Sequence, residues 1–146
     1  MPRRLVCFAL IAGSMLVLGP VVDARPQGAV VLGKSHLLRG GVGWGTALPD
    51  VIFNGGDPNG RAWNLRWSHW GAATASARGL TWIFRPNGGY FAKPAVIELR
   101  AGAIGRCSKG GPLAYTHLEA REAVRPGGPL GKWFDWGGWP SICRGP

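Results

Sequence analysis

Acidic side chains are scarce in this chain of 146 residues, which holds 7 Asp and Glu against 17 Lys and Arg and carries a formal net charge of +10. So few carboxylates leave little material for a glycosidase, which needs two of them across a cleft. The sequence also lacks the Gly-x-Ser-x-Gly elbow of many serine hydrolases. We therefore expect no catalytic residues, and a small secreted hydrolase is the least favoured function.

Closely spaced metal ligands are also lacking. The three histidines, His36, His69 and His117, are far apart in the sequence, whereas metal sites usually contain at least one tight ligand pair. We expect no metal site and no cofactor.

One motif is at odds with the expectation of no cofactor. Residues 28–35 match the Gly-x-x-x-x-Gly-Lys-Ser phosphate loop letter for letter. Such a loop works between a buried strand and a helix, yet no helix-forming segment follows at 36–41. We interpret the match as chance.

Residues 1–24 have the pattern of a signal peptide. Arg3 and Arg4 precede an apolar run over 5–18, Gly19-Pro20 breaks that run, and Ala24 offers a small-residue cleavage site. The run is shorter than the roughly 20 residues of a membrane-spanning helix, so a retained anchor is the less favoured alternative. We expect a secreted protein with no stable membrane span after cleavage.

Cysteine is limited to three residues, and Cys7 leaves with the signal peptide. The remaining pair, Cys107 and Cys143, should form a disulfide in an oxidising compartment. Closing that loop would stabilise the domain by about 3.5 to 4 kcal/mol in the chain-entropy model. The alternative is two unpaired thiols.

The basic residues are scattered singly along the sequence, without the cluster or stripe of a nucleic-acid-binding surface. We expect no specific nucleic-acid partner. Outside the cell the available partners are an anionic cell-wall polymer, a glycan or a surface protein.

Hydrophobic alternation predicts the fold. Residues 25–48 are rich in Gly and turn formers and are expected to be a flexible arm, followed by a β domain over 49–146. Within 61–70, Trp63, Leu65, Trp67 and His69 alternate with polar residues, as in a half-buried antiparallel strand. Further strands are predicted within 72–84, 95–100 and 113–118, and a helical turn at 119–124. The prediction is a monomeric all-β fold, a small antiparallel β-sandwich or barrel with one disulfide.

Several segments of this predicted domain form a set. They are LRWSHWG at 65–71, an Ala-, Thr- and Gly-rich stretch ending at Gly79, residues 94–99, Cys107, and AYTHL at 114–118. Over residues 51–143 the set resembles an uncharacterised family of small secreted actinobacterial proteins with a Trp-x-x-Trp-Gly segment. The resemblance implies export, a β fold and a disulfide, and it provides no catalytic residues.

The C-terminal segment is the richest in aromatic side chains. Trp133, Trp136 and Trp139 lie close together with Asp135, and exposed rings of this kind stack on sugars while a carboxylate accepts hydrogen bonds from hydroxyls. Alternatively, the rings cover the core and the disulfide. Strand parity predicts that Trp133 and Trp136 face opposite sides.

These observations favour a secreted, non-enzymatic β domain that binds a partner at or outside the cell surface. A carbohydrate or cell-wall binding module is the alternative. Its ligand-binding candidates are Trp133, Asp135, Trp136 and Trp139.

Overall fold

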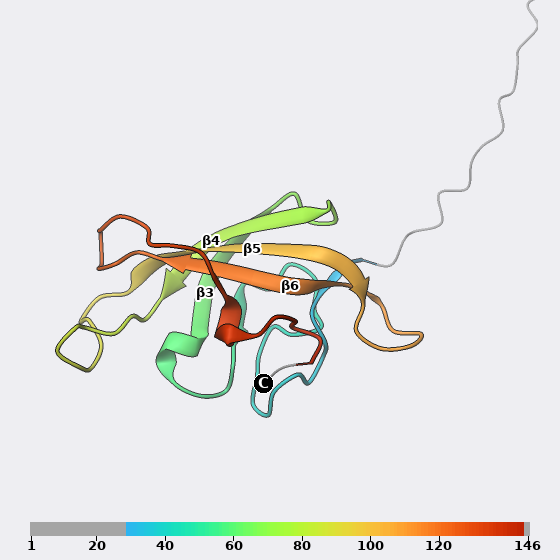
Figure 1. Ribbon diagram of the computed structural model, residues 1–146, viewed down its shortest axis with the longest axis horizontal. Helices are drawn as coiled ribbons and strands as arrows, with labels where there is room; N and C mark the ends of the chain where they lie inside the picture. Colours follow the sequence, from blue (N-terminus) through green and yellow to red (C-terminus); the bar gives the residue numbers. More distant parts are fainter. Residues whose placement is uncertain (1–28, 145–146) are drawn as a thin grey trace, which may run out of the picture.

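The computed structural model describes residues 29–144, which form one curled, mixed β-sheet with the shape of a half-barrel (Figure 1). The predicted signal peptide, 1–24, lies outside the described residues. The strands are β1 (Val31–Leu32), β2 (Val51–Phe53), β3 (Arg61–Ser68), β4 (Thr74–Thr81), β5 (Ala95–Arg106), β6 (Leu113–Glu122) and β7 (Phe134–Asp135), and the two 3-10 turns are η1 (Pro58–Gly60) and η2 (Trp136–Gly138).

The strand order is β1-β6-β5-β4-β3-β2, and β7 also pairs with β6. The neighbours from β2 to β6 are antiparallel, as the alternation predicted, and so is the pair of β6 and β7. Only β1 runs parallel to its neighbour among the described strands, with Val31 opposite Ala114. The all-β prediction is confirmed, with one parallel pair at the edge.

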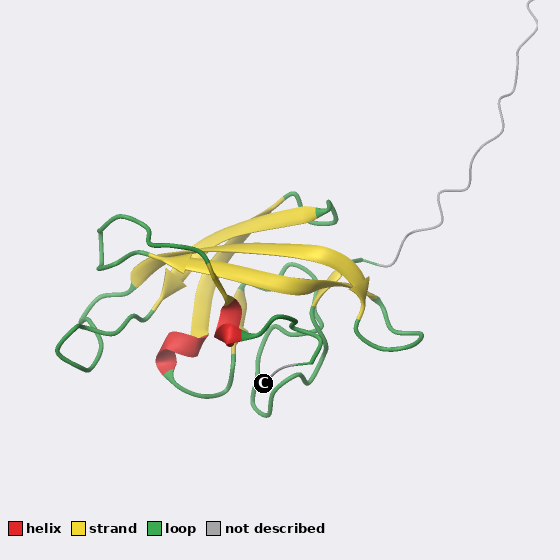
Figure 2. Cartoon of the chain, viewed as in Figure 1, coloured by secondary structure: helices red, strands yellow, loops and turns green. Residues whose placement is uncertain are grey.

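The core lies on the concave face of the sheet. Along β5, Ala95, Ile97, Leu99 and Ala101 point inward and are buried, because successive strand residues face opposite sides. Loops and both 3-10 turns lie on this side and cover the core (Figure 2). No helix within the described part of the chain is long and apolar enough to cross a membrane.

The segment that we expected to be a flexible arm belongs to the domain from residue 29 onward. Leu32 is fully buried, and Trp44 is 5% exposed and donates its indole N–H to the Phe53 carbonyl at 3.1 Å. Glycine makes this path possible: Gly43 adopts φ 85°, and a Cβ there would lie 2.2 Å from the Val51 carbonyl oxygen. Leu32 and Trp44 therefore pack into the same core as the strands that follow.

Only two of the three apolar side chains predicted to share one face of β3 do so. Asn64 has φ 53° and sits in a β-bulge between Trp63 and Arg66, and a bulge inserts one extra residue into a strand. Leu65 and Trp67 therefore face the core, while Trp63 lies on the outer face, where its ring centroid is 5.7 Å from that of Trp82.

The predicted helical turn at 119–124 and the predicted position of His69 on the Trp67 face were also wrong. The segment after Leu118 continues as strand β6 to Glu122, because Ala120 and Glu122 pair with Leu99 and Ile97 of β5 and this pairing overrides local helix propensity. His69 lies in a turn after β3 with φ 57° and is exposed, so it does not extend the Trp67 face.

The predicted disulfide is confirmed. Cys107 and Cys143 are bonded, with their Cα atoms 4.9 Å apart. The bond joins the end of β5 to the C-terminal segment, whose Trp136 and Ile142 are buried in the core. It therefore holds that segment across the concave side of the sheet.

Candidate functional site

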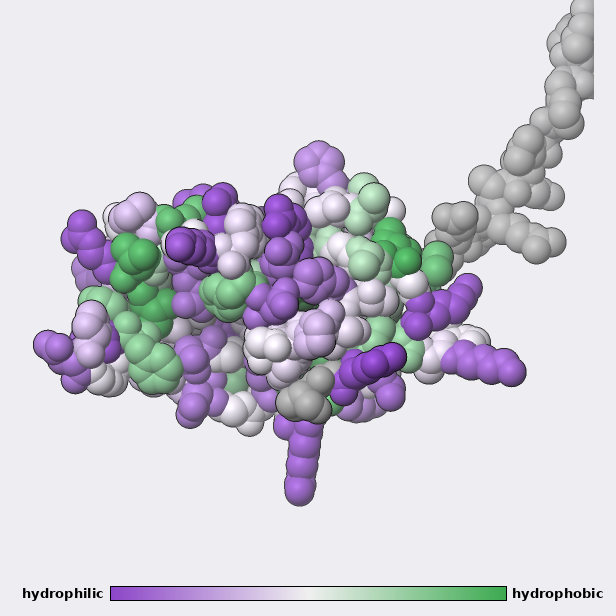
Figure 3. Space-filling view, viewed as in Figure 1, coloured by the Kyte–Doolittle hydropathy of each residue, from purple (hydrophilic) through white to green (hydrophobic). Residues whose placement is uncertain are grey.

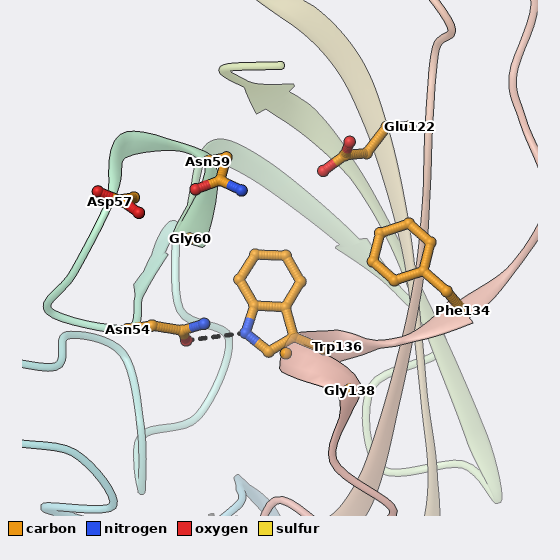
Figure 4. A pocket seen from close by; sticks show the side chains of 9 residues that line it. Asn54, Asp57, Asn59, Gly60, Glu122, Phe134, Trp136 and Gly138 are labelled. Atoms are coloured by element: carbon orange, nitrogen blue, oxygen red, sulfur yellow. Dashed lines mark hydrogen bonds between the residues drawn. The ribbon is translucent and has the colours of Figure 1, made fainter. Parts of the chain in front are cut away.

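A cavity of about 370 Å³ opens on the concave side, between the loop after β2 and the end of β6. Its volume is at the small end of the range of ligand sites, roughly 300 to 1,000 Å³. Figure 4 shows its side chains, with Asp57 and Asn59 on one side, Glu122 and Phe134 on the other, and the Trp136 ring between them. The lining residues are Asn54, Asp57, Asn59, Gly60, Glu122, Phe134, Trp136, Gly137 and Gly138.

The first wall is a tight polar loop over 54–60. The Asn54 amide donates to the Gly60 carbonyl at 3.0 Å, and the Gly60 amide donates to the Asp57 carbonyl at 2.9 Å. Gly55 has φ 78°, and a Cβ there would meet the Arg39 carbonyl oxygen at 2.4 Å. The loop thus holds Asn54, Asp57 and Asn59 on one rim of the cavity.

The second wall comes from β6 and β7. Phe134 pairs with Ala120 across the two strands, so its ring faces the same side of the sheet as Ala120 and Glu122. Phe134 is 44% exposed. Trp136 is 2% exposed and donates its indole N–H to the Asn54 side-chain oxygen at 2.9 Å, which joins the two walls.

Glu122 has an unusual electrostatic environment. It is half-buried, and desolvation raises the pKa of its carboxyl group to about 7. Its side chain makes no ion pair with any residue between 29 and 144. Near neutral pH the protonated and ionised forms therefore coexist, and the group can either donate or accept a hydrogen bond.

The cavity combines an exposed aromatic ring with amide and carboxyl groups. A ring offers an apolar surface for the face of a sugar, whereas Asn, Asp and Glu exchange hydrogen bonds with hydroxyls. This chemistry suits a neutral, polyhydroxylated ligand.

The four predicted binding residues do not form one platform. Trp136 lies beneath the cavity, and Trp139 is half-buried with its ring centroid 6.3 Å from that of Trp44. Trp133 and Asp135 lie on the outer face, where the Asp135 carboxylate is 2.7 Å from His117 Nε2. Trp133 and Trp136 therefore face opposite sides, as strand parity predicted.

Features that would favour other site types can also be compared with the structure. Trp63 and Trp82 have half-buried rings inclined at 42°, so they do not offer a coplanar pair. The His117–Asp135 pair is a histidine beside a carboxylate, but the two side chains are 38% and 45% exposed and do not line a described cavity. Within 29–144 no three His, Cys, Asp or Glu side chains are grouped as metal ligands.

The sequence interpretation missed most of the cavity. Of the residues that line it, only Trp136 was among the predicted binding residues, whereas Asn54, Asp57, Asn59, Glu122 and Phe134 were not. The dense run of Asn, Asp and Gly over 54–60 was the available signal, because polar loops on a rigid scaffold commonly carry binding groups.

The phosphate-loop match lacks its structural context where the chain is described. Strand β1 lies inside the motif, and turns rather than a helix follow it.

Comparison with family models, curated proteins and solved structures finds no match to this chain.

Proposed function

We propose that this protein is a secreted, non-catalytic β domain that binds a glycan in the concave cavity. One observation carries the proposal: the exposed Phe134 ring faces Asp57 and Asn59 across a single cleft, with Glu122 beside it. An aromatic ring flanked by hydrogen-bonding side chains matches the apolar faces and polar edges of a sugar ring.

The surrounding structure supports a binding role. The Trp136–Asn54 hydrogen bond and the paired strands β6 and β7 hold both walls of the cavity in place, and a preformed site loses less entropy on binding. A disulfide is typical of proteins in oxidising compartments, which is compatible with export.

Retention on insoluble glycans and purified cell wall, followed by titration with neutral oligosaccharides, tests this proposal. Phe134→Ala should weaken binding by at least about tenfold, because it removes the stacking surface. The unfolding midpoint of this variant should change little, since Phe134 is 44% exposed.

Phe84→Ala is the matched control, because Phe84 is 52% exposed and lies outside the cavity, stacked on Tyr90. It should leave binding unchanged. The proposal fails if no glycan is retained at moderate salt, or if the two variants bind equally well.

A second candidate function is glycoside hydrolysis. Two carboxyl groups, Asp57 and Glu122, line the cavity, and the raised pKa of Glu122, about 7, suits a general acid. The same titrations, followed for release of reducing ends, distinguish the two functions. A binding domain releases none, whereas a hydrolase loses activity in Glu122→Gln while still retaining the glycan.

A further inference from the structure

A second hollow lies on the outer face of the sheet, opposite the core, and basic side chains surround it. Alternation along the strands places Arg66 of β3, Arg78 of β4, Arg100 of β5 and Arg121 of β6 on this face. These residues are far apart in the sequence, where they showed no cluster. We call them, with Trp133, the outer arginine hollow.

The hollow has a volume of about 370 Å³ and also contains Ser68, Ser76 and Glu98. The Glu98 carboxylate binds two of the arginines, with Arg78 at 2.7 Å and Arg121 at 2.6 Å. Arg100 binds Glu119 at 2.8 Å. Two carboxylates thus share three guanidinium groups, which leaves the arrangement positively charged.

Arg66 adds to this excess. It makes no ion pair or side-chain hydrogen bond with any residue in the described chain, and it lies directly opposite Arg78 in the ladder between β3 and β4. Like charges directly opposite each other destabilise a sheet. An anion between them would turn that repulsion into attraction.

Trp133 holds two of the arginines in place. The guanidinium carbons of Arg100 and Arg121 lie 4.5 and 4.7 Å from the centroid of its ring, which is the geometry of a cation–π contact. The guanidinium groups are therefore oriented before a ligand arrives. The ring is occupied by these contacts, which disfavours base stacking.

We propose that the outer arginine hollow binds an acidic polysaccharide, with the arginines pairing to its carboxylate or phosphate groups. The mixture of charges favours a polysaccharide over a nucleic acid. Arginine forms paired hydrogen bonds with either anion, while Ser68, Ser76 and Glu98 can accept hydrogen bonds from sugar hydroxyls. Glu98 and Glu119 would instead repel a densely charged nucleic-acid backbone.

The exposed side chains of the outer arginine hollow are accessible to a large ligand. In Figure 3, hydrophobic side chains gather at the left end of the molecule, near the loops after β4 and β6, and again toward the right, with hydrophilic side chains between and around them. Within the hollow, Arg78 and Arg100 have side chains that are 63% and 43% exposed, so both can reach a polymer.

The experiment measures binding of the oxidised protein to polygalacturonate, which carries carboxylates, and to phosphorylated dextran, with unmodified dextran and single-stranded DNA alongside. Arg66→Gln with Arg78→Gln should weaken binding to at least one acidic polysaccharide by about tenfold or more, since charge-assisted hydrogen bonds are lost. The salt dependence of binding should fall with it. Whichever polymer shows the larger loss identifies the anionic group.

Arg39→Gln with Arg144→Gln is the charge-matched control, because both arginines are exposed and lie outside the hollow. It should change affinity far less than the first pair. Equal losses in both double variants would assign binding to net charge and overturn the proposal.

Two other outcomes would overturn the proposal as well. One is tighter binding of DNA that depends on Arg66 and Arg78, and the other is no binding of either acidic polysaccharide at physiological salt. Phe134→Ala should leave this binding intact, which separates it from the concave cavity.

Discussion

At the scale of single residues, Glu122 has the most distinctive chemistry in the described chain. Burial without a cationic partner raises the pKa of its carboxyl group from 4.5 to about 7. The folded state therefore holds this proton more tightly than the unfolded state. The resulting cost to stability is absent below about pH 4.5, grows as the pH rises towards 7, and is complete above that.

Glu122→Gln should remove this cost. We expect it to raise the free energy of unfolding by about 1 to 2 kcal/mol at pH 8, after allowance for solvent screening of a half-buried group, and to have little effect at pH 4. Denaturant titrations at several pH values measure the difference. Glu119→Gln is the matched control on the same strand, and it should not stabilise the protein at pH 8 because it breaks the ion pair with Arg100.

At the scale of elements, the bulge at Asn64 decides which side chains of β3 reach the core. Its φ of 53° is in the left-handed region, where Gly and Asn are tolerated and β-branched residues are strained. Asn64→Val should therefore destabilise the protein by about 1 to 3 kcal/mol, whereas Asn64→Gly should be close to neutral.

Ser68→Val is the control for introducing valine into β3, because Ser68 is exposed and lies outside the positive-φ residues. It should change the denaturation midpoint only slightly. If Asn64→Val and Asn64→Gly unfold at the same denaturant concentration, the bulge does not constrain this position.

The same bulge explains which parts of the fold could be predicted. Strict alternation located β3 to β6, because each pairs with a neighbour over a long antiparallel ladder. It could not show that one residue with positive φ moves Trp63 to the outer face. Nor could local propensity show that Glu119 and Glu122 extend a strand, since the cross-strand partners Arg100 and Ile97 decide that.

Both candidate sites depend on contacts between distant parts of the sequence. The concave cavity requires the loop at Asn54 to meet Trp136, 82 residues later in the chain. The outer hollow requires four strands to place single arginines side by side. Composition located the aromatic segment at 133–139, and alternation separated its two faces, but only the pairing with β6 shows that Phe134 is on the concave face and Trp133 on the outer one.

At the scale of the whole molecule, the disulfide and the C-terminal segment act together. Cys143 lies beside Ile142, which is buried and whose amide donates to the Thr116 carbonyl at 2.9 Å. The segment also supplies Phe134 and Trp136 to the cavity. The same segment therefore contributes both to the core and to a wall of the cavity.

Cys107→Ser with Cys143→Ser should lower the free energy of unfolding by about 3 to 4 kcal/mol, because the crosslink spans 36 residues and restricts the unfolded chain. The denaturant dependence should become steeper as the unfolded state expands. Wild-type protein unfolded in a reductant should match the variant, and the variant should not respond to the reductant. An unchanged midpoint in both would mean that the disulfide adds no stability.

Where the variant is still folded, glycan retention should persist, because β7 remains paired with β6 and Trp136 with Asn54. Loss of retention before unfolding would show that the crosslink itself holds the cavity in shape.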